Sequence, residues 1–423
     1  MDSIGAIYSR VSSHIFGDWN ACGKVMGLAP WHGYNWTYYD KDKGEDVCLT
    51  VTSINNPIMG GKLYSEGEDR FFVNRSTIVG VPIVSRNDPD LFDDDGDMVR
   101  KNRYDFDDMG TAFESNDEQS DGLRLPTRAA LDAISLAYRV QNDLESVALD
   151  FVSYFKEKTQ AKNLCLAGGV ALNSVLNGRL SRELGFESVF IPPYPGDDGI
   201  SIGCCAYALY GNAALSSQVS GRPFWSEPLS PYLGPFYSDY DIKQAIEEAS
   251  PWLNVETVLN EDERLNIMVK EIESGGIIAW FQGRSEIGPR ALGHRSILAD
   301  PREKRLVRFI NEKVKARETF RPFAPSVLVE EVERWFELQD SVVKTKNISP
   351  YMSLTALVKS AKRSIIPAVT HVDGSSRLQT VNEESEPMFY KLIKLFYKKT
   401  GVPMVLNTSF NTLKVSSWYG SFM

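Results

Sequence analysis

Short apolar strands alternate with amphipathic helices along this chain, and a glycine-containing turn joins each strand to the helix after it. The clearest instance runs from an apolar segment at 163–167 through Gly168 and Gly169 to a helical pattern at 171–184, with a second apolar segment at 188–191. Strands that alternate with helices indicate an α/β domain, in which ligands bind where a strand is followed by a helix. The sequence therefore predicts an α/β protein with candidate sites in these turns.

A long helix precedes this unit, and a second α/β unit follows it. Apolar residues recur at three- and four-residue steps from Ala137 to Phe155, which predicts a helix with one face in the core. A stretch rich in Ser, Pro and Gly at 215–237 is typical of a linker. A later helix at 386–399 is predicted to end at Gly401 as its C-cap. We therefore expect two domains, residues 1–218 and 219–423.

The overall charge excludes some classes of partner. The chain has 423 residues and a net charge of −10, which argues against nucleic acid or an anionic membrane as the main partner. Its five cysteines form no CxxC pair and are odd in number, which is typical of a reducing compartment. No apolar run reaches the roughly 18 residues that a membrane span requires. We therefore expect a soluble, cytoplasmic protein.

Three loop-like segments of the second domain carry cations in this otherwise acidic chain. They are Arg284, Arg290, His294 and Arg295 in the first segment, Lys315, Arg317 and Arg321 in the second, and His371 and Arg377 in the third. These cations stand beside Gly, Pro and Phe rather than at helical spacing, which favours an oxyanion site over a solvated charged face.

Three further features could bind a ligand or serve the fold alone. The Gly168-Gly169 turn could bring bare backbone N–H groups to a phosphate, or it could simply pack. The carboxylates Asp197 and Asp198 could ligate a metal or cap the following helix. Ser409 and Asn411 follow a buried strand two residues apart, so both could hydrogen-bond a phosphate or other polar oxygen of a ligand on one side of an extended segment.

Six segments in this order closely resemble one family of enzymes. They read AGGVALN, PGDDG, GPRALGHRSILADPR, FRPFAPSVL, HVDGSSRLQTV and GVPMVLNTSFN. The chain resembles the carbamoyltransferases that include nodulation-factor and cephem or aminoglycoside antibiotic carbamoyltransferases. The resemblance implies that residues 1–218 are the second lobe of an ASKHA-type (actin-like) domain. It implies that residues 219–423 are a YrdC-like domain, similar to threonylcarbamoyl-adenylate synthase.

The resemblance also implies a reaction and a set of site residues. In that family the YrdC-like domain joins carbamoyl phosphate and ATP, with Mg²⁺, into carbamoyl-adenylate, and the ASKHA-type domain passes the carbamoyl group to a small-molecule hydroxyl. The positions that match catalytic ones are Lys315, Arg317, Arg290, His294 and Arg377. Those that match cofactor contacts are Gly168, Gly169, Asn173, Arg295, Ser409 and Asn411, and Asp197 matches an iron-ligating aspartate.

The chain departs from the family pattern at the metal site. The family also uses a His-x-x-x-His pair in the first lobe, whereas this chain has four histidines, of which no two are four apart. We therefore expect an incomplete Fe²⁺ site and a missing first lobe. The alternative function is a truncated or degenerate paralogue that binds nucleotide or carbamoyl phosphate without catalysis.

Overall fold

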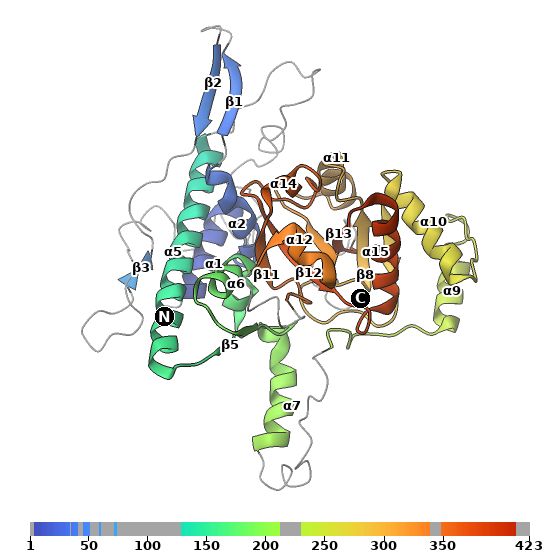
Figure 1. The fold of residues 1–423 in the computed structure, drawn as a ribbon, viewed down its shortest axis with the longest axis horizontal. Helices are drawn as coiled ribbons and strands as arrows, with labels where there is room; N and C mark the ends of the chain where they lie inside the picture. The colour runs from blue at the N-terminus through green and yellow to red at the C-terminus, as the bar shows by residue number, and fades with distance from the viewer. Residues whose placement is uncertain are drawn as a thin grey trace, which may run out of the picture.

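The computed structural model describes residues 4–33, 128–211, 230–338 and 348–411, together with four short strands at 35–40, 45–50, 59–60 and 72–73. We call residues 4–211 the first half and residues 230–411 the second half. The two halves lie side by side, with the helices of the first half against the sheet of the second (Figure 1). The predicted boundary at 218 and 219 lies outside the described residues. The α/β class is confirmed.

Helices build the core of the first half. They are α1 (Ile4–Phe16), α2 (Cys22–Leu28), the 3₁₀ turn η1 (Ala29–Gly33), α5 (Arg128–Thr159) and α6 (Ser174–Glu183). The predicted long helix is confirmed as α5, because Ala137, Val140 and Leu144 are all buried in this core. Two antiparallel strands, β1 (Asn35–Asp40) and β2 (Glu45–Thr50), form a hairpin, and β3 (Met59–Gly60) pairs with β4 (Phe72–Val73).

The predicted strand–turn–helix unit is also confirmed. Strand β5 (Asn163–Cys165) leads through η2 (Gly169–Leu172) into α6, and β6 (Ser188–Phe190) returns parallel to β5. The turn η3 (Asp197–Gly199) then opens α7 (Ile200–Gly211), which extends away from the rest of the molecule (Figure 1). A helix that is apolar all round is typically buried, yet the structure describes no buried residue on α7.

A seven-stranded sheet organises the second half. Its order is β10-β11-β12-β9-β13-β8-β7, and within it only β12 and β9 are parallel. The strands are β7 (Ile278–Phe281), β8 (Arg295–Ala299), β9 (Ala324–Leu328), β10 (Phe336–Glu337), β11 (Leu354–Val358), β12 (Ser375–Val381) and β13 (Met404–Ser409). Mixed sheets need apolar cover where both faces are buried, and β8 and β9 are buried along their whole length.

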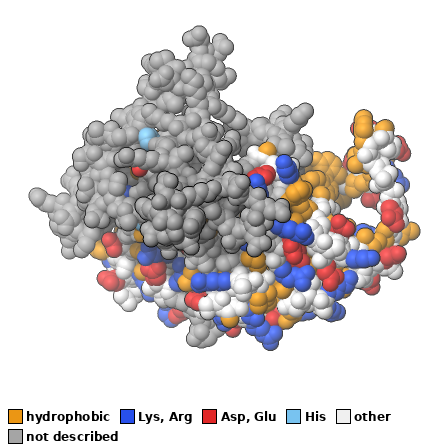
Figure 2. All heavy atoms as spheres, turned by 90° about the horizontal axis from the view of Figure 1, so that it is seen from above, with side chains coloured by type: hydrophobic (Ala, Val, Ile, Leu, Met, Phe, Trp, Pro, Cys, Tyr) orange, Lys and Arg blue, Asp and Glu red, His pale blue; other side chains and the backbone are white. Residues whose placement is uncertain are grey.

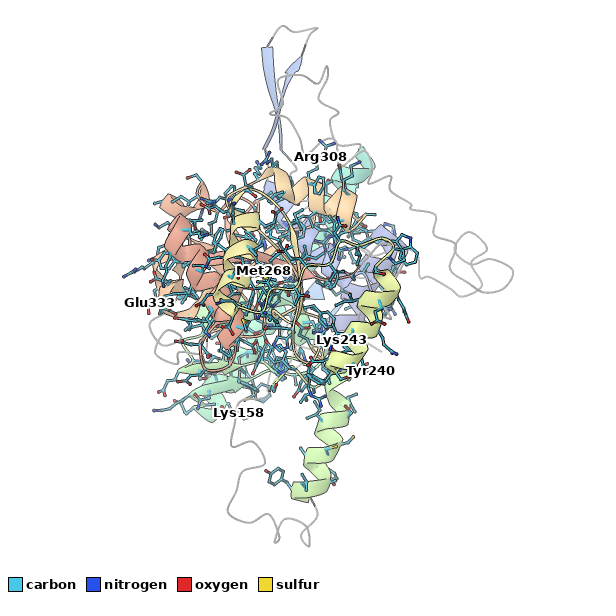
Figure 3. All side chains as sticks on the ribbon, turned by 90° about the vertical axis from the view of Figure 1, so that its right-hand side faces the viewer. Lys158, Tyr240, Lys243, Met268, Arg308 and Glu333 are labelled. Atoms are coloured by element: carbon cyan, nitrogen blue, oxygen red, sulfur yellow. The ribbon has the colours of Figure 1, made fainter. Side chains whose placement is uncertain are left out.

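Helices α10 (Glu261–Glu273) and α15 (Pro387–Thr400) contribute most of that cover. Phe389, Leu392 and Phe396 of α15 are fully buried in the core of the second half. Met268 of α10 packs against the same core, whereas Tyr240 on α9 (Asp239–Ala249) is 67% exposed (Figure 3). The predicted C-cap of α15 is confirmed, because Gly401 has φ +75° and donates its N–H to the carbonyl of Tyr397.

The remaining elements of the second half are short. They are α11 (Arg305–Phe309), the π-helical turn η4 (Ile310–Val314), the 3₁₀ turn η5 (Val329–Glu331), α12 (Val332–Trp335) and α14 (Ser360–Arg363). Of these, η4 matters for the site, because the chain leaves it directly into Lys315.

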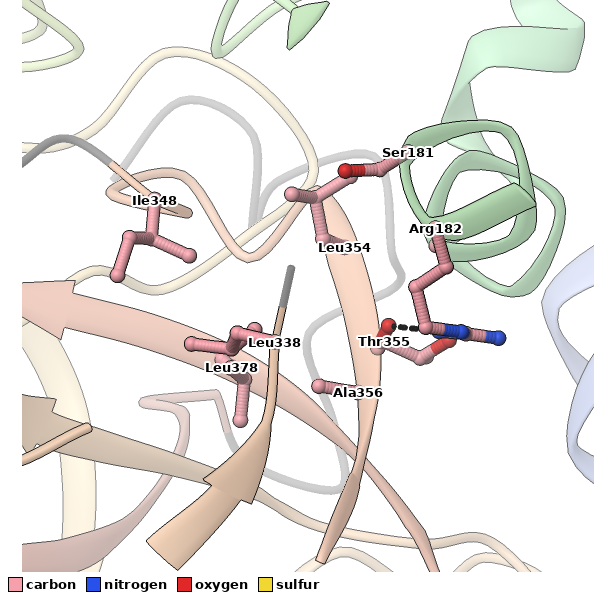
Figure 4. Close-up of a pocket in the computed structure, with 9 residues that line it drawn as sticks. Ser181, Arg182, Leu338, Ile348, Leu354, Thr355, Ala356 and Leu378 are labelled. Carbon is pink, nitrogen blue, oxygen red and sulfur yellow. Dashed lines mark hydrogen bonds between the residues drawn. The ribbon is translucent and has the colours of Figure 1, made fainter. Parts of the chain in front are cut away.

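The two halves meet where α6 packs on β11. Asn177 donates to the Ser353 carbonyl at 3.0 Å, and Arg182 donates to the Thr355 carbonyl at 2.8 Å. A small pocket lies at this junction, lined by Ser181 and Arg182 on one side and by apolar side chains of the second half on the other (Figure 4). The hydrogen bonds from α6 therefore tie it to an edge region of the sheet.

Within the part of the chain that the structure describes, no helix combines the length and apolar character needed to cross a lipid bilayer.

Candidate functional site

Lys315 joins the end of strand β13 to the turn that follows η4. Its Nζ atom lies 3.0 Å from Ser409 Oγ and also contacts the Ser409 carbonyl and Asn411 Oδ1. Ser409 Oγ in turn donates to Asn411 Oδ1 at 3.0 Å. The structure thus brings together the two predicted pairs, Lys315 with Arg317 and Ser409 with Asn411, from segments almost a hundred residues apart.

Two arginines, Arg317 and Arg321, act on the charge of this lysine, and Arg290 and Arg377 lie near those arginines. We call the five side chains the cation cluster: Arg290, Lys315, Arg317, Arg321 and Arg377, each of them half-buried. Burial, and then the charges of Arg290, Arg317 and Arg321, hold the pKa of Arg377 well below its usual value. A lowered arginine pKa of this kind results when neighbouring cations repel one another in a site with little water. The cluster is therefore suited to bind an anion.

The pKa values of other cations in the cluster are lowered as well. Burial and the charge of Arg321 lower the pKa of Arg290 to about 10 and that of Arg317 to about 9. Burial and the charges of Arg317 and Arg321 lower the pKa of Lys315 to about 7. On the face shown in Figure 2, basic and acidic side chains of the described residues are intermixed, so this face as a whole is not uniformly basic. The concentration of positive charge is local.

The turn after η4 aims Lys315 and Arg317 at the same place. Ala316 between them has φ +40°, a left-handed conformation that residues other than glycine rarely adopt. Arg317 donates through Nε to Asn311 Oδ1 at 2.7 Å, and its guanidinium lies 4.8 Å from the centre of the Phe323 ring. Asn311 also donates to the carbonyl of Arg321 at 3.0 Å. One buried amide thus orients two arginines of the cluster.

A buried carboxylate shapes the loop that carries Arg290. Glu286 accepts hydrogen bonds from the backbone N–H groups of Leu292 at 2.7 Å and His294 at 2.9 Å. Gly288 has φ +105°, and a Cβ there would come within 2.4 Å of the Pro193 carbonyl, so the loop needs glycine at this point. Arg290 reaches across to the first half, where its Nη2 lies 3.5 Å from the Leu172 carbonyl. The cluster therefore borders the Gly168-Gly169 turn.

The glycine turn itself presents open backbone. Gly168 has φ +93°, and a Cβ atom added to Gly168 or Gly169 would meet nothing within 4 Å. This space lets a ligand approach the backbone, as the sequence predicts. Asn173 is placed differently, because its side chain caps α6 by accepting from Leu176 N at 3.0 Å and is paired with Gln141. The predicted nucleotide contact of Asn173 is not favoured by these contacts.

The predicted metal ligand Asp197 stands alone. Its side chain is exposed, and no group of three or more His, Cys, Asp or Glu side chains in the described ranges is placed to hold a metal ion. Its neighbour Asp198 accepts hydrogen bonds from backbone groups of its own turn, which oppose the burial that raises the pKa of its carboxyl. The donors that the structure describes therefore do not fit an iron site.

His294 and Arg295 are engaged within the second half. The His294 ring stacks on Tyr232 at 3.6 Å, with Nδ1 2.6 Å from the Arg284 carbonyl and Nε2 2.9 Å from Glu386 Oε2. Arg295 donates to the carbonyls of Gln282 and Gly283 at 2.6 and 3.0 Å. Their predicted roles at the substrate stay predictions, and these contacts favour a role in holding the loop.

Two cations of the predicted oxyanion site, Arg321 and His371, were not among the positions matched to the family. Arg321 is a full member of the cluster, and His371 lies beside Arg377, with its Nδ1 3.2 Å from Ser375 Oγ. Burial, opposed by Asp373 and assisted by Arg377, lowers the pKa of His371. The signal for both was present, because each stands in a basic segment that the sequence had already singled out.

Comparison with known proteins supports one family. Residues 94–206 match the family model described as carbamoyltransferase N-terminus, and residues 269–416 match that described as carbamoyltransferase C-terminus. Nodulation protein NolO of Bradyrhizobium diazoefficiens is 40% identical over 274 residues, which are 64% of this chain and 47% of that protein. Nodulation protein NolNO of Sinorhizobium fredii is 41% identical over 278 residues, covering 65% of this chain and 39% of that protein.

A third relative is less similar in sequence. Nodulation protein U of Rhizobium tropici is 35% identical over 252 residues, which are 59% of this chain and 38% of that protein. The chain thus spans less than half the length of these relatives.

Proposed function

The chain belongs to the carbamoyltransferase family, a family of transferases, and on that basis we propose that it takes part in ATP-dependent transfer of a carbamoyl group to a hydroxyl. In the activation step, carbamoyl phosphate, ATP and water give carbamoyl-adenylate, inorganic phosphate and pyrophosphate. In the transfer step, a hydroxyl of a small molecule takes the carbamoyl group and AMP leaves.

The observation that carries this proposal is the cation cluster. Carbamoyl phosphate and the ATP polyphosphate are both anions, so bringing them together requires fixed positive charge in a site with little water. The five cations of the cluster supply that charge, and Lys315 joins them to the hydrogen-bonding side chains of Ser409 and Asn411. Lys315 and the arginines would bind the phosphate groups, and planar guanidiniums suit two-point contacts with phosphate oxygens.

Residues of the first half would bind the nucleotide. The open backbone at Gly168 and Gly169 suits a phosphate, and Arg290 already links this turn to the cluster through the Leu172 carbonyl. Mg²⁺, which the reaction needs with ATP, would be held chiefly by the nucleotide's own phosphates.

Two measurements test the proposal. The purified chain should bind carbamoyl phosphate in isothermal titration, and it should exchange labelled pyrophosphate into ATP only when carbamoyl phosphate is present. A chain that binds neither carbamoyl phosphate nor ATP would contradict the proposal.

The second candidate function is binding without transfer. It is favoured by the surroundings of Asp197, since no group of three or more His, Cys, Asp or Glu side chains among the described residues is placed to hold a metal ion. Under this alternative, carbamoyl phosphate and ATP bind, but no acceptor hydroxyl becomes carbamoylated. Radiolabelled carbamoyl incorporation distinguishes the two functions.

A further inference from the structure

A lysine of the first half reaches the cation cluster of the second half through a carboxylate. Lys24 lies on α2, in the segment GKVMGLAP. Its Nζ atom donates to Glu318 Oε1 at 2.6 Å, across 294 residues of sequence. The lysine stem crosses the Phe16 ring, with Nζ 5.3 Å from the ring centre. Glu318 itself stands one residue after Arg317, a member of the cluster.

The chain around Glu318 is anchored on the first half. Phe320 is only 3% exposed and belongs to the core of the first half, where its ring stacks against Phe16 at 6.3 Å. A Cβ atom added to Gly27 would come 3.4 Å from the Pro322 ring. Helices α1 and α2 therefore form the platform on which this part of the anion site rests.

The second carboxylate oxygen of Glu318, Oε2, has no hydrogen-bond partner. Oε2 is buried, and Arg321 Nη1 lies 3.7 Å from it. Burial raises the pKa of Glu318, but the charge and hydrogen bond of Lys24, together with a backbone hydrogen bond and the charge of Arg321, outweigh it, and the pKa is below its usual value. The carboxylate is thus ionised and stands between two cations, bound to Lys24 and at a longer distance from Arg321.

We propose that Lys24 is a positioning residue of the anion site: by holding Glu318, it keeps this carboxylate from neutralising Arg321, which stays available to an anionic substrate. This inference rests on the proposed function only for the identity of that anion, carbamoyl phosphate or a nucleotide phosphate. Without the Lys24 charge, Arg321 is the remaining cation that contacts Glu318 among the described residues. Arg321 already lies 3.7 Å from Glu318, and a shorter, hydrogen-bonded pair between them would neutralise more of the positive charge that the cluster offers to an anion.

A purely structural role predicts a different pattern. Partly exposed ion pairs typically contribute about 1 kcal/mol or less to stability, and this pair is 27% and 19% exposed at its two side chains. If the pair merely joined the halves, loss of either partner would have the same effect on stability and on binding. If Glu318 competes for Arg321, the two substitutions have opposite effects on binding.

Isothermal titration of the full chain with carbamoyl phosphate makes this comparison. Lys24→Met, which keeps the apolar stem over Phe16, should weaken binding about tenfold, the scale of one lost charge-assisted contact. Glu318→Gln should bind as tightly as the unchanged chain or more tightly. The double variant Lys24→Met/Glu318→Gln should recover the affinity. Lys391→Met is the matched control, because Lys391 pairs with Glu261 at 2.7 Å away from the cluster, and it should change nothing.

Several results of these titrations would contradict the role of Lys24. Unchanged affinity in Lys24→Met, or equal losses in both single variants, would overturn the inference. If Lys24→Met does not fold, as thermal unfolding would show, weakened binding by a folded Glu318→Gln would also overturn it, because the inference makes Glu318 a competitor. If the unchanged chain binds no carbamoyl phosphate, the proposed function fails instead.

Discussion

Gly178 of α6 lies against Thr355 of β11 so closely that a Cβ atom on Gly178 would come 2.3 Å from the Thr355 carbonyl oxygen and 2.7 Å from its Oγ1. Gly178→Ala should therefore force the halves apart or shift β11, at a cost of about 1–3 kcal/mol. Chemical denaturation measures this cost. Gly203→Ala on α7 is the control, since a Cβ there meets nothing within 4 Å and alanine favours a helix. Equal stability of the two variants would contradict the close packing.

The cation cluster should lose affinity when single members are removed. Lys315→Ala and Arg377→Ala should each weaken carbamoyl phosphate binding by about 1.5–3 kcal/mol, the scale of a lost charge-assisted hydrogen bond. Titration calorimetry provides the measurement, with Lys391→Ala as a control cation outside the cluster. Unchanged affinity in both variants would remove the cluster from substrate binding.

The binding of anions should depend on pH through Lys315. Burial and the charges of Arg317 and Arg321 lower its pKa to about 7, so the lysine loses its proton as the pH rises through that value. Affinity for carbamoyl phosphate should therefore fall above about pH 7, and binding near pH 7 should take up a proton. Lys315→Arg should move this dependence to higher pH, because the pKa of an arginine lies above that of a lysine in the same surroundings. Titrations in buffers of different ionisation enthalpy would measure the proton uptake directly.

The same shift has a consequence for stability. The folded-state pKa of Lys315 lies below its unfolded value, so between about pH 7 and pH 10.4 the unfolded chain binds more protons at this residue. The contribution of Lys315 to the free energy of unfolding should therefore rise with pH across this window. Lys315→Met should remove that rise, as denaturation midpoints at several pH values would show.

The glycine turn should be required for nucleotide binding and not for folding. A Cβ atom on Gly169 meets no other atom within 4 Å, so Gly169→Val should leave the fold intact while its side chain fills the space beside the backbone. Circular dichroism should be unchanged and adenine-nucleotide binding abolished. Full binding by the folded variant would show that the turn serves packing alone.

The 423-residue chain by itself should carry out the activation step but hold no stoichiometric iron and transfer no carbamoyl group, so that pyrophosphate exchange separates it from a chain that only binds. One exposed aspartate leaves most of a metal's ligand sphere to water, whereas a functional site needs several protein ligands and supporting hydrogen bonds. Metal analysis and radiolabelled carbamoyl incorporation test this. Stoichiometric iron together with robust transfer would mean that ligands outside the described residues complete the site.

The sequence by itself determined the local architecture. The repeat of apolar residues predicted α5, and the glycines at 168, 169 and 401 predicted the turn into α6 and the end of α15. Such features follow from periodicity and from backbone freedom, which depend on neighbours only a few residues away. The sequence also predicted an anionic ligand, because arginines beside glycine and proline in loops are typical of oxyanion sites.

Only the tertiary structure decided which side chains share the site. Arg321 joins the cluster while Arg295, in an equally basic segment, is bound by backbone carbonyls of its own loop. Lys24 meets Glu318 across most of the chain, although nothing in their local sequences pairs them. A side chain's partner is set by the packing of α2 against the turn after η4, and a contact that depends on such distant packing leaves no local pattern in the sequence.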